Sequence, residues 1–137
     1  MIYPDKFLLT GKVAFITGGV GFLGIEVTKA FAEAKARVVV LDVDEDKGQK
    51  LIRELTDKGF KVEFERFDIT ELTDIEKSID KLFLKYGRID VWVNAAYPRT
   101  KDWGEKVENL NIKSWQKNID MHLNSYSWIS RKVCLIM

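Results

Sequence analysis

The stretch FITGGVGFLG, residues 15–24, joins a short apolar run to the start of a helical pattern through several glycines. Three of them, Gly18, Gly21 and Gly24, stand at intervals of three. Glycine loses more backbone freedom on folding than any other residue, so such a concentration at one junction needs a physical reason. The pattern predicts a strand-to-helix turn whose main chain must come very close to another group.

On both sides of this stretch the sequence alternates between strand and helix patterns. Short apolar or alternating runs predict strands over residues 12–17, 37–42, 61–68 and 89–96. Helical spacing of apolar residues predicts helices over 22–34, 44–59, 72–87 and from 112 onward, with an irregular stretch over 97–111. In the first helix we expect these apolar side chains to face inward: Phe22, Ile25, Val27, Ala30 and Phe31. The alternation predicts an α/β fold with parallel βαβ units and helices on both faces of one sheet, in a single domain over residues 1–137.

Composition and charge exclude several classes of function. The chain has 137 residues, 46% hydrophobic and 31% charged, and its 22 basic and 21 acidic residues give a net charge of +1. This balance offers no broad surface for nucleic acid or an anionic membrane. The lone Cys134 favours a reducing, cytoplasmic compartment, and no apolar run approaches the roughly 18 residues of a membrane span. We expect a soluble cytoplasmic protein without a metal site.

The glycine loop has the pattern of a dinucleotide-binding turn. A pyrophosphate is favoured at a helix N-terminus, where unpaired N–H groups and the positive end of the helix dipole attract anions. Gly18 can take the tight turn, Gly21 can let the backbone approach the phosphate, and Gly24 can let the helix pack closely. Thr17 can tie the loop through its hydroxyl. The alternative is a glycine-rich turn that binds nothing.

Asp42 supports the dinucleotide interpretation. It ends the second predicted strand 18 residues after Gly24, where a carboxylate accepts hydrogen bonds from the adenosine ribose. Such a carboxylate would repel a 2′-phosphate, and no Arg or Lys follows before Lys47, so NAD is favoured over NADP. Asp42 could instead be a helix cap or turn residue, and Asp44 could compete for either role.

Five segments together resemble the short-chain dehydrogenase/reductase family from about Lys12 to the end: TGGVGFLG, VVVLDVDEDKG, FDIT, IDVWVNAA and WQKNIDMHLNSY. The resemblance implies an NAD(P)-binding Rossmann fold, a doubly wound parallel sheet whose four strands here take the order 3-2-1-4. It also implies that Asp68 and Ile69 border the adenine, and that Asn94, Ala95 and Ala96 lie near the adenosine and the nicotinamide ribose. The remaining expected cofactor contacts are Thr17, Gly18, Gly21, Phe22, Leu23, Gly24, Asp42 and Val43.

The sequence also departs from the family. Its glycine spacing is that of the extended branch, which works on nucleotide sugars, whereas the downstream segments look like the compact branch. NAAY stands where the compact branch has Asn-Asn-Ala-Gly, so Ala95 removes an amide and Tyr97 fills a glycine position. His122 stands where the compact branch has an Asn that helps to hold a proton-relay water. His122 could bind such a water through either ring nitrogen, or be purely structural.

The family's proton-transferring residues have no match here. A Tyr and a Lys must stand four apart on one helix, with a Ser upstream, so that they act on one oxygen. Tyr97 and Lys101 have that spacing, but Pro98 and Gly104 disfavour a helix there. We expect the chain to be the N-terminal portion of such an enzyme, with an unpaired fourth strand. In isolation it should be inactive, bind NAD weakly and tend to aggregate.

Three hypotheses for function remain open. The first is the cofactor-binding half of an NAD-dependent oxidoreductase acting on a small alcohol or carbonyl, such as a sugar. The motifs NAAYPR, DWG and DMHL also resemble family members of flagellin-modification and nonulosonic-acid sugar pathways. The second is a nucleotide-sugar epimerase or dehydratase of the extended branch, and the third is a non-catalytic NAD-binding module. The resemblance implies a homo-oligomer through the last helix, where Trp115, Tyr126 and Trp128 could form an interface or ordinary core.

Overall fold

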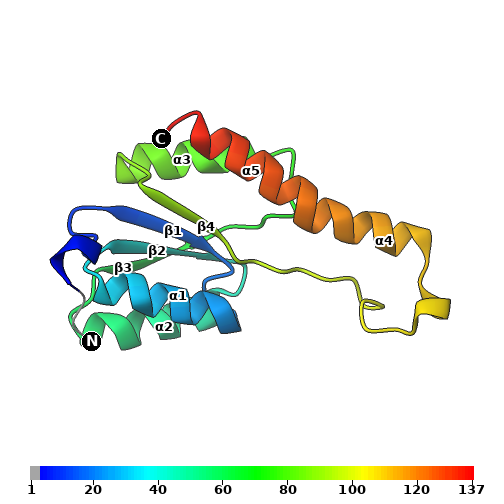
Figure 1. The fold of residues 1–137 in the computed structure, drawn as a ribbon, viewed down its shortest axis with the longest axis horizontal. Coiled ribbons are helices and arrows are strands. Elements are labelled where there is room, and N and C mark those ends of the chain that lie inside the picture. Colours follow the sequence, from blue (N-terminus) through cyan, green and yellow to red (C-terminus); the bar gives the residue numbers. More distant parts are fainter. Residues whose placement is uncertain (1–3) are drawn as a thin grey trace.

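The computed structural model describes residues 4–137 and contains one parallel sheet of four strands. The strands are β1 (Val13–Thr17), β2 (Arg37–Asp42), β3 (Val62–Arg66) and β4 (Val91–Asn94). Their order is β3-β2-β1-β4, so β1 lies in the interior of the sheet between β2 and β4 (Figure 1). This arrangement confirms the predicted α/β class and the predicted strand order.

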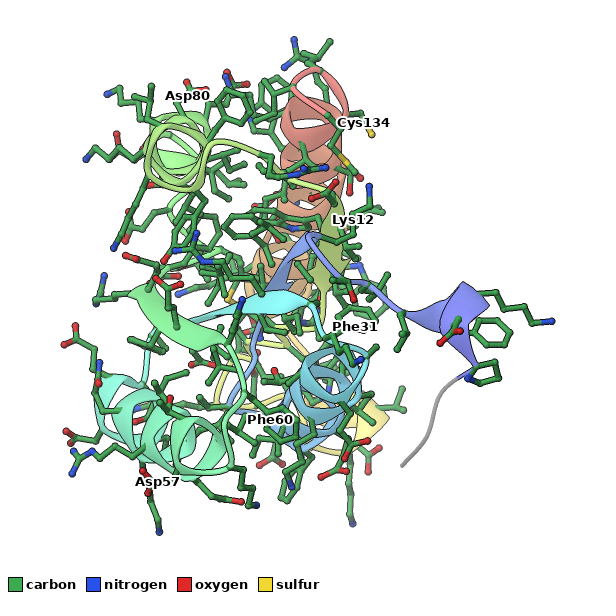
Figure 2. All side chains as sticks on the ribbon, turned by 90° about the vertical axis from the view of Figure 1, so that its left-hand side faces the viewer. Lys12, Phe31, Asp57, Phe60, Asp80 and Cys134 are labelled. Atoms are coloured by element: carbon green, nitrogen blue, oxygen red, sulfur yellow. The ribbon has the colours of Figure 1, made fainter. Side chains whose placement is uncertain are left out.

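Helices cover both faces of the sheet, as Figures 1 and 2 show. On one face lie α1 (Phe22–Glu33) and α2 (Glu45–Asp57), and on the other lie α3 (Ile75–Tyr86) and α5 (Ser125–Cys134). In Figure 2, Phe31 and Asp57 mark the first pair, and Asp80 and Cys134 mark the second. Short 3₁₀ turns, η1 (Asp5–Phe7) and η2 (Val107–Asn109), lie outside these layers.

The alternation of side chains along the strands creates two hydrophobic cores. In β1, Ala14 and Ile16 face α1 and α2, whereas Val13 and Phe15 face α3 and α5. Successive residues of a strand point to opposite faces, so a strand covered on both sides must be apolar at every position. The fully buried run of β1 therefore follows from its interior place.

Helix α1 packs through a stripe of small residues. Gly24, Thr28 and Ala32 are its buried positions, spaced four apart on one helical face. The expectation that Phe22 faces inward was wrong, because its side chain is 99% exposed. Phe22 is the first residue of the helix and lies off the small-residue stripe, which is the surface that approaches the sheet.

The predicted last helix is interrupted. It consists of α4 (Ile112–Ile119), a π-helical turn η3 (Asp120–Asn124) and α5, and α4 reaches well beyond the sheet (Figure 1). The Ser125 amide donates to the Asp120 carbonyl five residues back, and the Ser125 hydroxyl donates to the Met121 carbonyl at 2.7 Å. A serine hydroxyl that competes for backbone carbonyls loosens the ordinary helical pattern. Hydrophobic spacing alone does not reveal this turn.

Strand β4 ends the sheet, and no further strand pairs with it in residues 4–137. The segment after it is irregular over 95–106, apart from turns, so the strand predicted to run to residue 96 ends two residues earlier, and the stretch predicted as irregular over 97–111 contains the short turn η2. Tyr97 and Lys101 accordingly do not share a helix. None of the helices in the described part of the chain is long and apolar enough to cross a membrane.

Two leucines of α3 offer a matched test of this packing. Leu82 is 6% exposed in the core under β1, whereas Leu84, two residues on, is 81% exposed. Leu82→Ala should lower the free energy of unfolding by about 2–5 kcal/mol through lost burial and a residual cavity. Leu84→Ala should change it by less than about 0.5 kcal/mol. Urea denaturation of both variants measures this, and equal losses would contradict the assigned orientation of α3.

Asp90 links the start of β4 to the start of β1. Its Oδ2 accepts a hydrogen bond from the Val13 amide at 2.9 Å, and its Oδ1 pairs with Lys12 Nζ at 3.2 Å. Arg88 Nε also donates to Oδ2 at 2.6 Å. The Arg88 hydrogen bond, with smaller contributions from Val13 and Lys12, holds the pKa of the Asp90 carboxyl at about 2.

Acid should weaken this link over a defined pH range. The pKa of Asp90 is about 2 when folded and about 4 when unfolded, so its contribution is present above about pH 4 and is lost as pH falls toward about 2. In Asp90→Asn, the free energy of unfolding should fall less steeply over that range than in the wild type. Urea titrations at successive pH values measure the two slopes. Identical slopes would show that Asp90 contributes nothing to acid sensitivity.

Candidate functional site

A cavity of about 630 Å³ lies where the carboxyl ends of the strands meet the first turn of α1. Eleven of the residues predicted from the sequence line it: Gly18, Gly21, Phe22, Leu23, Gly24, Asp42, Val43, Asp68, Ile69, Ala95 and Ala96. Five further lining residues were missed: Phe67, Thr70, Tyr97, Pro98 and Arg99. Thr17, Asn94 and His122 were predicted but do not line the cavity. The carboxyl ends of the strands are the edge at which ligands bind in open α/β sheets.

Gly18 and Gly24 are required because a Cβ at either position would collide with the protein's own backbone. Gly18 has a φ of +65°, and a Cβ there would lie 2.5 Å from the Ala96 Cα atom. A Cβ at Gly24 would lie 2.0 Å from the Gly18 carbonyl oxygen. Gly21 differs, because the only group near a Cβ there is the same carbonyl at 3.2 Å. The space beside Gly21 therefore opens on the cavity.

The first turn of α1 presents unpaired amides. Gly21 is the N-cap and supplies no side-chain hydrogen bond. The first hydrogen bond of the helix is donated by the Ile25 amide to the Gly21 carbonyl at 2.9 Å. The amides of Phe22, Leu23 and Gly24 precede that bond and have no partner in residues 4–137. Together with the helix dipole, such donors attract an anion.

Asp42 organises the loop while lining the cavity. Its Oδ2 accepts from the Val20 amide at 3.2 Å, and its Oδ1 accepts from the amides of Val43 at 2.8 Å and Asp44 at 3.1 Å. Asp44 is the N-cap of α2, accepting from the Lys47 amide at 3.0 Å. The capping role weighed for both residues thus belongs to Asp44, and Asp42 remains at the cavity.

Thr17 and Asn94 support the cavity wall from behind. Thr17 is 1% exposed, and its Oγ1 accepts from the amides of Ala95 at 3.1 Å and Ala96 at 3.3 Å. The Asn94 amide lies between two side chains: its Oδ1 accepts from Trp92 Nε1 at 3.0 Å, and its Nδ2 donates to Ser130 Oγ at 3.1 Å. Both residues therefore fix the end of β4 through the protein's own groups.

Asp68 and Ile69 form a turn after β3. Asp68 Oδ1 accepts from the Thr70 amide at 2.9 Å and from the Thr70 hydroxyl at 2.7 Å. Ile69 is buried, so it contributes an apolar floor to this side of the cavity. An apolar floor beside a carboxylate suits a flat, partly polar ring system.

His122 lies behind the cavity wall. Its Nε2 contacts the Pro98 carbonyl, and its ring stacks on that of Tyr97 with 4.1 Å between centroids. Trp103 meets the His122 ring edge-on at 5.7 Å. A carbonyl only accepts, so Nε2 must carry a proton, and Nδ1 is the nitrogen left for a water. The sequence left either ring nitrogen of His122 open to bind a water, and the structure uses one of them, Nε2, for the Pro98 carbonyl.

One sequence signal could have found the missed residues. The first half of the motif NAAYPR ends the strand predicted over 89–96, so the three residues that follow, Tyr97, Pro98 and Arg99, had to lie at the carboxyl end of that strand. Phe67 and Thr70 stand directly before and directly after the predicted site residues Asp68 and Ile69. No group of three or more metal-ligating side chains occurs within residues 4–137.

Comparison with known proteins gives consistent matches. The sequence model of the short chain dehydrogenase family matches residues 12–137. The chain is 34% identical over 119 residues to the 3-oxoacyl-(acyl-carrier-protein) reductase FabG of Chlamydia muridarum, covering 86% of this chain and 47% of that protein. It is 30% identical over 128 residues to the post-translational flagellin modification protein A of Campylobacter coli, covering 91% and 50%.

Solved structures match over nearly the whole chain. The crystal structure of gox2181 superposes with a TM-score of 0.87 at 29% identity, covering 99% of this chain and 52% of that one. A gluconate 5-dehydrogenase from Burkholderia cenocepacia, in complex with NADP and tartrate, gives 0.80 at 28% identity, covering 96% and 50%. The chain thus spans about half the length of the proteins it matches.

The hydroxyl of Thr17 offers a test of how the wall is held. Thr17→Val keeps the shape but leaves the Ala96 amide without its acceptor, so it should lower the free energy of unfolding by about 1–3 kcal/mol. Hydrogen exchange at Ala96 should become faster. Thr17→Ser retains the hydroxyl and should stay close to the wild type in both measurements. Equal exchange rates in the Val and Ser variants would refute the role of this hydroxyl.

Proposed function

The chain belongs to the short-chain dehydrogenase family, and on that premise we propose that its cavity binds NAD for a hydride-transferring oxidoreductase. The family consists of NAD(P)-dependent oxidoreductases, to which the matched reductase and dehydrogenase belong. When bound, the nicotinamide supplies the hydride donor or acceptor. The observation that carries the proposal is that one cavity joins the unpaired amides of α1 to the Asp42 carboxylate.

The residues of the glycine loop fit a diphosphate. The amides of Phe22, Leu23 and Gly24 would donate to its oxygens, and the open side of Gly21 would leave room for them. Gly18 and Gly24 serve a different purpose, because they let the loop pack against Ala96 and against itself. In this proposal, the loop's shape depends on Gly18 and Gly24, and its ligand contact depends on Gly21.

Asp42 favours NAD over NADP. Three backbone amides bind its two oxygens, which leaves further acceptor positions on a residue that lines the cavity, where ribose hydroxyls could donate. The first basic side chain after it, Lys47, pairs with Asp44 at 2.7 Å rather than reaching toward a 2′-phosphate. Because Asp42 is an anion and Lys47 is already paired, a 2′-phosphate is disfavoured at this position on electrostatic grounds.

Hydride transfer needs a proton donor or acceptor that these residues do not supply. The one Tyr-x-x-x-Lys spacing in the chain, Tyr97 to Lys101, falls in the irregular segment. Burial raises the pKa of Tyr126, which is opposite to what an activated tyrosine requires. We therefore propose that this chain is the cofactor-binding half and does not turn over substrate alone, with His122 Nδ1 helping to hold a water of the proton path.

The substrate we propose is a small alcohol or carbonyl compound, with a sugar favoured. The name of the Burkholderia cenocepacia protein, a gluconate 5-dehydrogenase, supports a carbohydrate-related substrate. The glycine spacing favours one alternative, a nucleotide-sugar epimerase or dehydratase of the extended branch, and a non-catalytic NAD-binding module would use the same cavity. The lone Cys134 supports a cytoplasmic setting.

We also propose a homo-oligomer through the last helical segment. Ile112, Trp115, Ile119 and Leu123 are exposed at spacings of three and four along α4 and η3, which makes an apolar stripe. Trp128 is exposed on α5, whereas the Tyr126 hydroxyl is used within the chain, donating to the Ala96 carbonyl. The interface weighed from the sequence would therefore involve Trp115 and Trp128 rather than Tyr126.

Titration with NADH and NADPH, followed by calorimetry, tests the cofactor assignment. The wild type should prefer NADH, and Asp42→Ala should raise the dissociation constant for NADH by about tenfold through lost ribose hydrogen bonds. NADPH should lose less affinity or gain some, because the repelling carboxylate is gone. Asp57→Ala removes the same charge from the exposed end of α2 and should change neither value. Equal binding of both nucleotides by wild type and Asp42→Ala would reject this role for Asp42.

A further inference from the structure

We propose that Arg99 is an anion-binding residue of the cavity, which takes a carboxylate or phosphate group of a ligand bound next to the dinucleotide. The inference rests on the proposed function in one respect: NAD is taken to occupy the glycine-loop end of the same cavity. Its chemistry is that of a guanidinium and an oxyanion, which form paired, charge-assisted hydrogen bonds.

Arg99 is a cation without a counter-ion in a concave site. It is the only basic residue among those that line the cavity, where the charged neighbours are Asp42 and Asp68. No acidic side chain within residues 4–137 pairs with it, whereas Arg37 and Arg88 each form an ion pair. Arg99 lines the cavity, is exposed and has no acidic partner within residues 4–137, so its guanidinium is free to receive an anionic ligand.

The backbone on both sides of Arg99 is fixed by helix side chains. Before it, His122 Nε2 donates to the Pro98 carbonyl. After it, the Thr100 amide donates to Asn118 Oδ1 at 3.2 Å, and Asn118 Nδ2 donates to the Thr100 hydroxyl at 2.7 Å. Asn118 is only 5% exposed, so this grip is shielded from water. An otherwise irregular segment is thereby held in place at Arg99.

Asn118 on α4 and His122 on η3 stand four residues apart and therefore project from one side of the last helical segment, residues 112–134. Their common target is the three-residue segment centred on Arg99, whose backbone they hold from both ends. A binding residue presented this way loses less conformational entropy on ligand binding than one on a free loop. Asn118 and His122 are thus positioning residues for Arg99.

An aromatic ring supports the guanidinium. Arg99 Cζ lies over the Tyr97 ring, 6.0 Å from its centroid, and the Tyr97 ring itself stacks on His122. Contact with the face of an aromatic ring orients a guanidinium while leaving its N–H groups free for an oxyanion. Tyr97 and His122 are also two positions at which this sequence departs from its family's pattern, and here they are in direct contact.

Calorimetric titration of the 137-residue chain tests the inference with two anionic probes, gluconate and inorganic phosphate. Sorbitol is the neutral control, ionic strength is matched with chloride, and each titration is run with and without saturating NADH. Arg99→Gln should raise the dissociation constant for gluconate by about tenfold, the usual weight of a charge-assisted contact. Arg53→Gln is the matched control, because Arg53 lies exposed on α2 and also has no ion pair within residues 4–137. It should bind like the wild type.

The titrations with and without NADH show whether Arg99 binds an oxyanion of a second ligand or one of the cofactor. If gluconate binds alongside NADH and only its affinity falls in Arg99→Gln, the anion belongs to a second ligand. If gluconate competes with NADH and both weaken together, Arg99 binds a cofactor phosphate, and the assignment of a second ligand is overturned. Anion affinity that is absent in the wild type, or equal in wild type and Arg99→Gln, overturns the inference. NADH binding tests the proposed function separately. If the chain does not bind NADH but still binds gluconate in an Arg99-dependent way, the proposed NAD-binding function is rejected and the role of Arg99 stands.

A second pair of variants tests the positioning role of His122. His122→Ala should raise the dissociation constant for gluconate by about threefold, because the segment around Arg99 gains freedom that binding must remove. His122→Gln can donate its amide N–H to the Pro98 carbonyl and should restore most of the affinity. A general loss of structure would not be rescued in this selective way, so equal weakening in both variants would refute the positioning role.

Discussion

The close approach of Gly18 to the segment Ala95–Ala96 is the constraint on which the rest of the site depends. A side chain at Gly18 would collide with the backbone of Ala96, so two strand ends far apart in sequence can meet only because one residue lacks a Cβ. Thr17 then holds them together through hydrogen bonds to both alanine amides. The glycine that starts the loop thus shapes the opposite wall of the cavity as well.

Asp42 likewise holds several backbone segments together with one side chain. Its carboxylate accepts the Val20 amide of the glycine loop and the amides of its own turn, so one side chain connects the ends of β1 and β2. These bonds fix the carboxylate before any ligand arrives, and a group that is already oriented binds with a smaller entropic cost. Structural and binding roles of Asp42 are therefore not alternatives, because the first role prepares the second.

The resemblance to the short-chain dehydrogenase family implied the strand order and most of the eleven predicted residues of the cavity wall, which lie together because strand ends in a parallel sheet converge on one edge. Sequence periodicity predicted the parallel sheet and its two helical layers. It was wrong about Phe22, since hydrophobicity does not reveal that α1 packs through small residues. It also missed the π-helical turn, at which the Ser125 hydroxyl donates to the Met121 carbonyl. The contact between Tyr97 and His122 joins residues 25 apart through side-chain geometry, which no local pattern encodes.

The π-helical turn allows the last helical segment, residues 112–134, to pack against two different surfaces, the sheet and the irregular segment after β4. Beyond the turn, Ser125, Ile129 and Val133 succeed each other at intervals of four and are buried against the sheet. Asn118, before the turn, and His122, within it, share the same spacing but hold the irregular segment after β4. An extra residue in one helical turn shifts the angular phase of all later residues by about 100° relative to a regular α-helix. Core packing and support of the cavity wall can therefore be optimised separately along a single continuous element.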